Sequence, residues 1–514
     1  MSRGRVKTIT LATMCFVSFI AHLDTTVVNV ALPKIQINLG SSMSALQWIL
    51  NAYTLPTASL ILTSGTLGDI YGRKRIFLAG LVIFTIASVV CGFAPSLGIL
   101  IAGRTLQGIG AAALVPSSLA ILADAFPEPK EKTKAIGIWA AVSAIALVTG
   151  PVLGGLLVDT LGWRSVFLLN LSLGVIAFGV TSRVVKESQN PSRQSLDVPG
   201  LVLSIVLMAS LTYALTQGNA GVGQSPLSFW LLAVSGLSLV GFLVIESHSS
   251  HPMLPLYLFN NRTFAIVNVV SVLVFFTFAS LLFIFNLFLQ QVQGYSATAT
   301  GLGFLPLNAA YVISLLCSGW FAARLGWRFA ISMGLILMAV ATLSLIKISA
   351  DTEYQTIMWN LILSGLGGGL TVAPLAAAAM SSVSSTQAGI ASAVLNTSNS
   401  LGGVLGVALQ GTILTQSLAS DLRRSLSAWG LPTNLQDRLI AGALHGGAND
   451  LPASISGLAF HQAFSDAFVS GLHTALLIAS VALLAGAFLV LLFVQPTFNQ
   501  VTKNSLISIK QKKT

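Results

Sequence analysis

The sequence predicts an all-α integral membrane protein with fourteen transmembrane helices. Hydrophobic residues make up 54% of the 514 residues and charged residues only 8%, whereas a soluble domain carries about 25% charged residues. Apolar runs of about 20 residues, the length needed to cross a bilayer, recur from one end of the chain to the other. The mean hydropathy of +0.85 is also far above that of a soluble protein.

The apolar runs define the expected helices in order. Two of them, 299–322 and 357–380, are rich in Gly, Ala and Ser, the small residues that packed membrane helices use at their contacts. The expected spans are 9–30, 45–64, 76–94, 98–122, 135–157, 165–183, 198–216, 227–245, 264–289, 299–322, 329–348, 357–380, 388–414 and 470–494.

The distribution of basic residues predicts the orientation. An even number of spans places both termini on one side of the membrane. With the N-terminus in the cytoplasm, 19 of the 26 Lys and Arg residues fall on the cytoplasmic side and six fall outside, while Arg104 lies within a span. This asymmetry follows the positive-inside rule and predicts a multi-pass protein of the bacterial cytoplasmic (inner) membrane. The excess of basic residues behind the net charge of +11 is therefore expected to contact the lipid bilayer and not nucleic acid.

Asp24 lies inside the first apolar run. A carboxylate at membrane depth costs roughly 2.5 to 3.5 kcal/mol on insertion scales, so it marks a candidate functional site. A titratable group buried there can carry a proton across the membrane. The alternative is a structural Asp held by Thr25, Thr26 or Asn29.

Glycines and charges follow a fixed order between the second and third spans. Gly65, Asp69, Gly72, Arg73 and Lys74 give Gly-x-x-x-Asp-x-x-Gly-Arg-Lys. A tight turn with inside-positive charge would account for the residue types but not for their order. The order resembles the loop signature of the major facilitator superfamily, although Ile70 stands where many members have Arg or Lys.

Three further segments carry the same resemblance. Arg104, Gln107, Gly108 and Gly110 resemble the fourth-helix signature of that superfamily. Gly150, Pro151, Gly154 and Gly155 resemble the antiporter signature, which is typical of its exporters. The segment 23–33 resembles the first-helix signature of the fourteen-span drug:proton antiporters.

The resemblance implies a major-facilitator-type fold of two bundles. Residues 9–183 would form an N-terminal six-helix bundle, and 184–246 a linker with two extra transmembrane helices. Residues 264–494 would form a C-terminal six-helix bundle. That bundle includes 415–469, expected as an external loop with an amphipathic helix near Leu435–Leu444.

Roles in proton coupling and gating follow from the same resemblance. Arg104 would tune the proton affinity of Asp24, since the family fold brings spans one and four together; a structural Arg bonded to helix carbonyls is the alternative. Asp124 would pair with Arg73 to latch the inward gate, or be a helix-end charge. The expected gating residues are Gly65, Asp69, Gly72, Arg73, Asp124, Gly150, Pro151, Gly154 and Gly155; for the last four, a packing kink is the alternative.

The polar residues of the spans predict the substrate's charge. No Asp or Glu other than Asp24 is expected deep in a span, so an uncharged, zwitterionic or anionic amphiphile fits better than a dication. Substrate and proton could then compete for Asp24. The candidate cavity residues are Asn29, Trp48, Tyr53, Gln107, Asn286, Asn308, Tyr311, Asn396 and Asn399.

The resulting hypothesis is a monomeric, proton-coupled efflux transporter that exports amphipathic drugs or toxic compounds by alternating access. It would use the proton gradient and no cofactor or metal, and a periplasmic adaptor is a candidate partner. One alternative is a dedicated exporter of one metabolite, siderophore or lipid. A remote alternative is a membrane acyltransferase, because His461 and Asp466 have the spacing of some acyltransferases.

Overall fold

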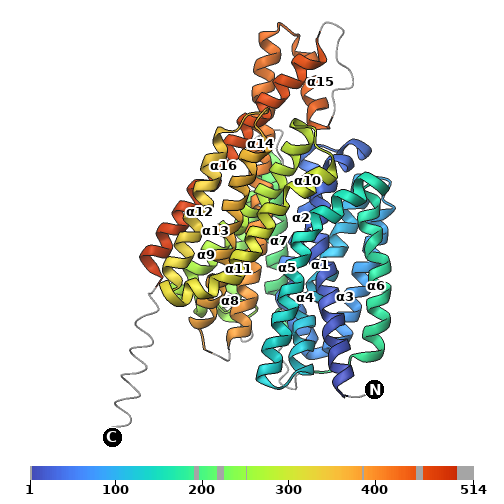
Figure 1. Ribbon diagram of the computed structural model, residues 1–514, viewed down its shortest axis with the longest axis vertical. Helices are drawn as coiled ribbons and strands as arrows, with labels where there is room; N and C mark the ends of the chain where they lie inside the picture. Colours follow the sequence, from blue (N-terminus) through green and yellow to red (C-terminus); the bar gives the residue numbers. More distant parts are fainter. Residues whose placement is uncertain are drawn as a thin grey trace.

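The computed structural model describes residues 3–189, 196–216, 225–249, 252–384, 387–446 and 455–494. These residues form helices joined by short connections, without strands in the described ranges. Two groups of helices lie side by side, and α15 projects beyond them (Figure 1). We call the end that carries Arg3 and Gly72 the lower end, and the end that carries Leu39 and α15 the upper end.

The first six helices pack chiefly on one another. Helix α1 lies against α4, α5 and α6, while α3 packs on α4 and α6, and α2 on α4. The bounds are α1 (Arg3–Leu39), α2 (Met43–Tyr71), α3 (Arg73–Gly92), α4 (Leu97–Ala125), α5 (Pro129–Leu161) and α6 (Arg164–Val184). We call this group the first bundle.

The C-terminal helices form a second group, here called the second bundle. Helix α9 packs on α14 and α16, α11 on α13, and α12 on α13 and α16. The bounds are α9 (Arg262–Leu287), the π-helix η2 (Phe288–Val292), α10 (Ala297–Gly303), α11 (Leu305–Leu325), α12 (Trp327–Ser344), η3 (Leu345–Lys347), α13 (Tyr354–Ser381), α14 (Ala388–Ala428), α15 (Thr433–Leu444) and α16 (Gly457–Phe493).

A helical hairpin separates the two bundles in the chain. Helices α7 (Val198–Thr216) and α8 (Pro226–His248) pack on each other, and α7 also touches α2 and α14. The short helix η1 (Leu256–Asn260) then leads into α9. The hairpin therefore flanks the line along which the first and second bundles meet.

Local sequence signals explain several helix ends. The Ser42 side chain accepts a hydrogen bond from the backbone of α2, and Asn261 caps the first turn of α9 in the same way. Such caps satisfy backbone donors that the first helical turn leaves free. The expected span 299–322 is divided at Phe304 into α10 and α11, because Pro306, the second residue of α11, has no N–H to donate to α10.

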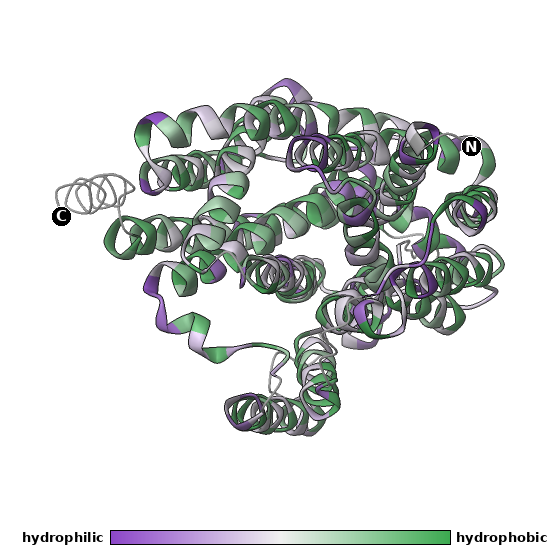
Figure 2. Ribbon diagram, turned by 90° about the horizontal axis from the view of Figure 1, so that it is seen from below, coloured by the Kyte–Doolittle hydropathy of each residue, from purple (hydrophilic) through white to green (hydrophobic). Residues whose placement is uncertain are grey.

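The expected all-helical membrane fold is confirmed. Thirteen helices among the described residues are long and apolar enough to cross a membrane. Helix α2 is a further helix of 29 residues, whose buried polar residues such as Gln47, Asn51 and Ser59 lower its hydropathy. The ribbons are mainly hydrophobic, and hydrophilic residues gather on several of the connecting segments (Figure 2).

The expected external loop 415–469 is wrong in its described part. Helix α14 continues to Ala428, and α16 already begins at Gly457. Leu418, Leu422 and Leu426 form one buried stripe that packs with Leu439 and Ile440 of α15. Hydropathy marked only the apolar part of α14, although its polar end continues as a helix. The amphipathic helix expected near Leu435–Leu444 is present as α15.

Candidate functional site

Asp24 lies in the middle of the first bundle and is completely buried. The Nη1 atom of Arg104 donates to its Oδ2 at 2.5 Å. The Nδ2 atom of Asn170 in α6 donates to its Oδ1 at 2.8 Å, and Gln107 Nε2 lies 3.4 Å from the same oxygen. Two helices, α4 and α6, therefore surround the carboxylate of α1 with donors.

Arg104 is held from several sides. Its Nε atom donates to the carbonyl of Ile49 at 3.2 Å, and Nη1 also reaches Oε1 of Gln107 at 2.9 Å. The ring of Tyr53 stacks 4.3 Å from the guanidinium carbon. A guanidinium is always charged in proteins, so this setting fixes a permanent positive charge beside Asp24.

The buried ion pair distinguishes between the alternatives for Asp24. Thr25, Thr26 and Asn29 donate to carbonyls of their own helix and not to the carboxylate. The partners of Asp24 come instead from other helices. Removing one partner of such a buried pair costs about 3–5 kcal/mol, because the remaining charge loses its counter-charge.

A cavity of about 400 Å³ lies between the two bundles. First-bundle residues, including His22, Arg104 and Tyr53, line one side of it, and second-bundle residues, including Phe278 and Tyr311, line the other. The lining combines aromatic and aliphatic groups with a few amides, which is the usual character of a small-molecule site. The described lining residues include Arg104 and no Asp or Glu.

The structure divides the nine expected cavity residues into two sets. Asn29, Tyr53, Tyr311, Asn396 and Asn399 line the cavity. Four others lie elsewhere. Trp48 packs on Tyr213 of α7 with ring centroids 5.6 Å apart, and Gln107 belongs to the Asp24 network. Asn286 donates to the carbonyl of Asn29 above the cavity, and Asn308 is buried in α11. Helix rotation, which spacing alone does not give, explains the difference.

Asp24 itself is not among the residues that line the described cavity. Arg104 and Tyr53, which do line it, also contact the carboxylate or its partner. This geometry does not favour direct competition between substrate and proton for Asp24, because the carboxylate does not face the cavity. A bound molecule would meet the far side of Arg104.

Sequence reasoning missed Asn170 and Ser88. Asn170 bonds Asp24, and its Nδ2 lies 3.4 Å from Ser88 Oγ, which in turn accepts a hydrogen bond from Gln107 at 2.6 Å. The available signal was an amide in the middle of the apolar sixth span. Glu246 lies near the end of α8, in keeping with the expectation that no other acid lies deep in a span, but it is only 3% exposed.

The upper half of the bundle interface is closed. Asn286 Nδ2 donates to the Asn29 carbonyl at 2.5 Å, and Gln290 donates to the Val30 carbonyl at 3.0 Å. Asp159 of α5 accepts two hydrogen bonds from Thr298 of α10. Hydrogen bonds between the first bundle and α9–α16 in the described part of the chain lie in this upper half.

The antiporter-like glycines lie within this closure. A methyl group added at Gly155 would collide with the Ala297 carbonyl of α10, and one added at Gly301 would collide with the Pro151 carbonyl. Helices α5 and α10 thus touch backbone to backbone. Gly150 and Gly154 similarly allow α5 to lie directly against α1.

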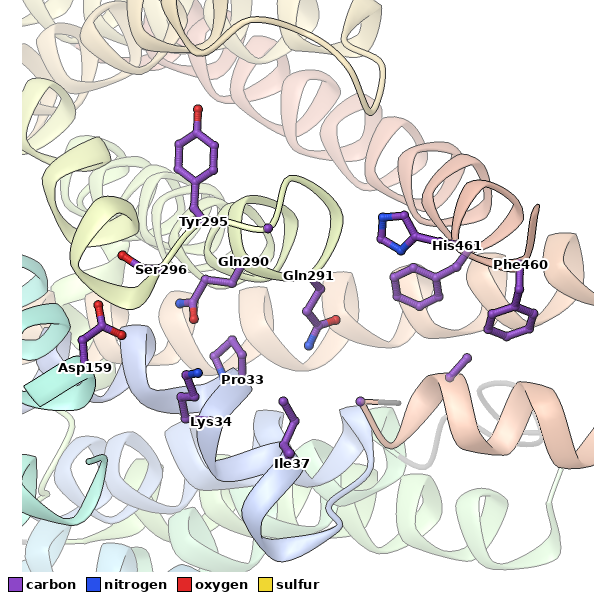
Figure 3. A pocket seen from close by; sticks show the side chains of 14 residues that line it. Pro33, Lys34, Ile37, Asp159, Gln290, Gln291, Tyr295, Ser296, Phe460 and His461 are labelled. Carbon is purple, nitrogen blue, oxygen red and sulfur yellow. The ribbon is translucent and has the colours of Figure 1, made fainter. Parts of the chain in front are cut away.

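A second pocket of about 550 Å³ opens above the closure (Figure 3). Lys34, Asp159, Gln290, Gln291 and His461 are among its lining residues. Asp466 follows His461 by five positions on α16, which rotates it by about 140° around the helix. In the described structure no hydrogen bond joins them, so the His base lacks the orienting Asp that the acyltransferase alternative requires.

At the lower end, three charged residues form one cluster within the first bundle. Arg73 donates to Asp69 from Nε at 3.0 Å and from Nη2 at 2.8 Å, and its Nη1 donates to Asp124 at 2.5 Å. Gly72 has φ of +110°, and a Cβ there would lie 2.6 Å from the Glu187 carboxylate. The expected Arg73–Asp124 contact is present, but it joins α3 to α4 and not one bundle to the other.

Gly65 has no close neighbour in this structure. A Cβ added there would find no atom within 4 Å. In this structure no other helix approaches Gly65 closely enough to require a glycine there. The lower part of α2 is otherwise packed, since Ser64 donates to the Ala112 carbonyl of α4 and Gly68 is buried.

Two helical bundles with a cavity between them are the architecture of membrane transporters whose bundles move relative to each other. Residues 14–407 match the Major Facilitator Superfamily. The chain belongs to this family.

Similar proteins extend over nearly the whole chain. The multidrug resistance protein Stp of Mycobacterium tuberculosis is 35% identical over 95% of this chain and 91% of that protein. The cephamycin export protein CmcT of Amycolatopsis lactamdurans is 34% identical over 84% of this chain and 89% of its own length. The methylenomycin A resistance protein of Streptomyces coelicolor is 34% identical over 77% of this chain and 83% of that protein.

A solved structure shares the fold. The crystal structure of a bacterial homologue of the human lysosomal transporter Spinster superposes with a TM-score of 0.66 at 18% identity. The match covers 96% of this chain and 99% of the Spinster homologue.

Proposed function

We propose that this protein is a proton-coupled efflux transporter that exports amphipathic compounds by alternating access. The names of its relatives, which refer to multidrug resistance and antibiotic export, support efflux. The observation that carries the coupling is the Asp24–Arg104 pair, in which Arg104 touches both the carboxylate and the cavity.

The proposed organisation uses two bundles that rock about the cavity. The first bundle, 9–183, and the second bundle, 264–494, would move relative to each other, and the linker 184–246 would carry the hairpin between them. With the N-terminus in the cytoplasm, the lower end faces inward. A closed upper interface then corresponds to an inward-facing state.

The proton would act through a change of charge beside the cavity. Protonation of Asp24 Oδ2 replaces the ion pair with a neutral carboxyl group, while Arg104 stays charged. The wall of the cavity thereby gains one positive charge. An exporter must hold its substrate while Asp24 is deprotonated and release it after protonation outside.

This charge change narrows the substrate class. An added positive charge attracts an anion, so a purely anionic substrate would be bound at the step that requires release. A dication would find no carboxylate among the described lining residues. Of the uncharged, zwitterionic and anionic compounds expected from the sequence, we therefore propose uncharged or zwitterionic amphiphiles as substrates.

The central experiment compares Asp24→Asn with wild type in proteoliposomes carrying a pH gradient. We expect Asp24→Asn to lose gradient-driven uptake of substrate into inside-out vesicles and substrate-induced proton release, while it still folds and binds substrate. Asp351→Asn, at an exposed position, is the matched control and should behave as wild type. Full gradient-driven transport by Asp24→Asn would refute the coupling role.

The substrate proposal needs a separate panel. Dicationic, monocationic, uncharged, zwitterionic and anionic amphiphiles of similar size would be compared for proton-linked transport. We expect transport of several uncharged or zwitterionic members. Equally fast transport of the dications would contradict the charge argument, whereas transport of a single compound would favour the dedicated exporter of one metabolite, siderophore or lipid.

The oligomeric state can be checked with the same preparation. We propose that the monomer is the transporting unit, since one chain supplies both sides of the cavity. Transport by proteoliposomes reconstituted at less than one chain per vesicle would support this, and a requirement for several chains would contradict it. A periplasmic adaptor stays a candidate partner, which faster transport on its addition would support.

A further inference from the structure

Two acidic residues meet at the lower end of the α7–α8 hairpin, outside both bundles. Asp197 precedes the first residue of α7, and Glu246 lies in the last turn of α8. Glu246 is only 3% exposed. Burying a carboxylate without a counter-charge costs free energy, so the groups that stabilise Glu246 have to be identified.

Each carboxyl group uses one oxygen to hold backbone. Asp197 Oδ1 accepts from the Gly200 N–H at 2.8 Å and so caps the first turn of α7. Glu246 Oε2 accepts from the Leu254 N–H at 3.1 Å, in the connection between the hairpin and the second bundle. Both side chains are thereby fixed in place.

The remaining two oxygens, Asp197 Oδ2 and Glu246 Oε1, are buried and have no hydrogen-bond partner. They also converge on one place. A Cβ added at Gly200 would lie 2.8 Å from Asp197 Oδ2 and 3.0 Å from Glu246 Oε1. Glycine at this position therefore leaves room beside two unpartnered carboxyl oxygens, which both lie within 3.0 Å of one point.

No fixed cation compensates this pair in the described part of the chain. Helix α7 contains no Asp, Glu, Lys, Arg or His, and neither does η1. The nearest titratable group on α8, His248, is exposed and bonds the Val244 carbonyl and Ser247. On α2, which packs on α7, Asp69 is paired with Arg73.

We propose that Asp197 and Glu246 share one bound proton and form a second proton-binding site of this protein, separate from Asp24. The proton sits between Asp197 Oδ2 and Glu246 Oε1 as an O–H···O⁻ hydrogen bond, and the pair then carries one negative charge instead of two. It joins the beginning of α7 to the end of α8. The site does not depend on the proposed efflux function.

The test is infrared difference spectroscopy of the purified full-length protein between acid and alkaline pH. The carbonyl stretch of a protonated carboxyl group reports the shared proton. The difference is taken from about pH 6 upward, where exposed carboxyl groups stay ionised. In this range we expect Glu246→Gln to remove one titrating band of the wild type, and Glu353→Gln, at an exposed position, to leave the spectrum unchanged. A band retained in full by Glu246→Gln would overturn the proposal.

A second variant keeps both acids. Gly200→Ala introduces a methyl group 2.8–3.0 Å from the two oxygens and should shift or abolish the same band, although alanine is favourable in a helix. Thermal melts check folding. The melting temperature of the wild type should fall as the pH rises, because two facing carboxylates repel, and this fall should be smaller in Glu246→Gln. An equal fall in both would contradict the proposal.

A metal ion is the competing occupant. The titration would be repeated in sodium chloride and in choline chloride of equal ionic strength. We expect no difference for the shared proton. Displacement of the Glu246 band by sodium would assign the site to a metal ion and overturn the proton proposal.

Discussion

The cores of the two bundles use different polar chemistry. In the first bundle, Asp24 and Arg104 form a fully buried ion pair. In the described part of the second bundle no ion pair is buried, and neutral contacts join its helices, such as Thr342 Oγ1 to Ser480 Oγ at 2.7 Å and the partly buried Ser398 Oγ to Asn268 Oδ1 at 2.9 Å. One bundle thus holds a group whose charge can change, and the other offers a fixed neutral surface to the same cavity.

This difference suggests that the two bundles have different roles in transport. A neutral hydrogen bond contributes about 0.5–1.5 kcal/mol to stability and does not change with the membrane gradient. A carboxylate beside a permanent cation can alter the charge of the cavity wall by gaining one proton. The first bundle would therefore carry the coupling, and the second bundle would supply shape and amides for recognition.

The largest expected effect is from Arg104→Ala. Loss of the guanidinium leaves Asp24 buried without its counter-charge, which should cost about 3–5 kcal/mol of stability. Equilibrium unfolding in detergent would measure it. Arg104→Lys is the control. It keeps the positive charge and loses only the additional contacts to the Ile49 carbonyl and Gln107, so it should be destabilised less. Equal stability of Arg104→Ala and wild type would remove the contrast between the bundles.

The contact between the bundles is the next target. Gly155→Val should drive α5 away from the Ala297 carbonyl of α10, and overpacking of this kind costs about 1–3 kcal/mol. We expect the closed upper interface to open. The reaction of a cysteine at position 29 with an impermeant thiol reagent should accelerate about tenfold, which corresponds to roughly 1.4 kcal/mol.

Gly137→Val provides the matched control for that experiment. Gly137 lies on the same helix, and a Cβ there meets no atom within 4 Å. The background should carry Cys317→Ser, because Cys317 is exposed while Cys15 and Cys91 are buried. Unchanged labelling in Gly155→Val, or equal acceleration in Gly137→Val, would argue against the α5–α10 contact as the closure.

A smaller effect is expected in the second bundle. Ser398→Ala removes the donor to Asn268 and should cost about 1 kcal/mol. The same unfolding experiment would measure it, and proton-driven transport should be retained. A loss of coupling as severe as that expected for Asp24→Asn would show that the second bundle also carries the proton.

The smallest expected effect is at the lower end. Arg73→Gln breaks contacts to Asp69 and Asp124 that are partly exposed, and such pairs contribute about 0–1 kcal/mol. Stability should barely change, but a cysteine at position 61 in the cavity should change its accessibility if the cluster governs inward gating. Arg75→Gln, where Arg75 is largely exposed, is the control. Identical accessibility in both variants would favour the alternative of a simple helix turn.

Spacing and composition predicted many residues of the site, but not which of them lie together in space. Asp24 and Arg104 stood out because charges in apolar runs are costly, and the structure brings them together. Trp48 and Asn286 were expected in the cavity because they are aromatic or polar residues within spans, but Trp48 packs on α7 and Asn286 bonds α1. Asn170 gave only a weak signal, because one amide in a span can be satisfied by its own helix.

The sequence by itself determined the helical membrane fold, since apolar runs of bilayer length must satisfy their backbone groups internally. Its signature residues also indicated the family. Only the tertiary structure decided that Arg104 stands between Asp24 and the cavity, and that Asp197 and Glu246 meet across Gly200. Those relations depend on the rotation and packing of helices distant in the chain, and hydropathy and spacing contain neither.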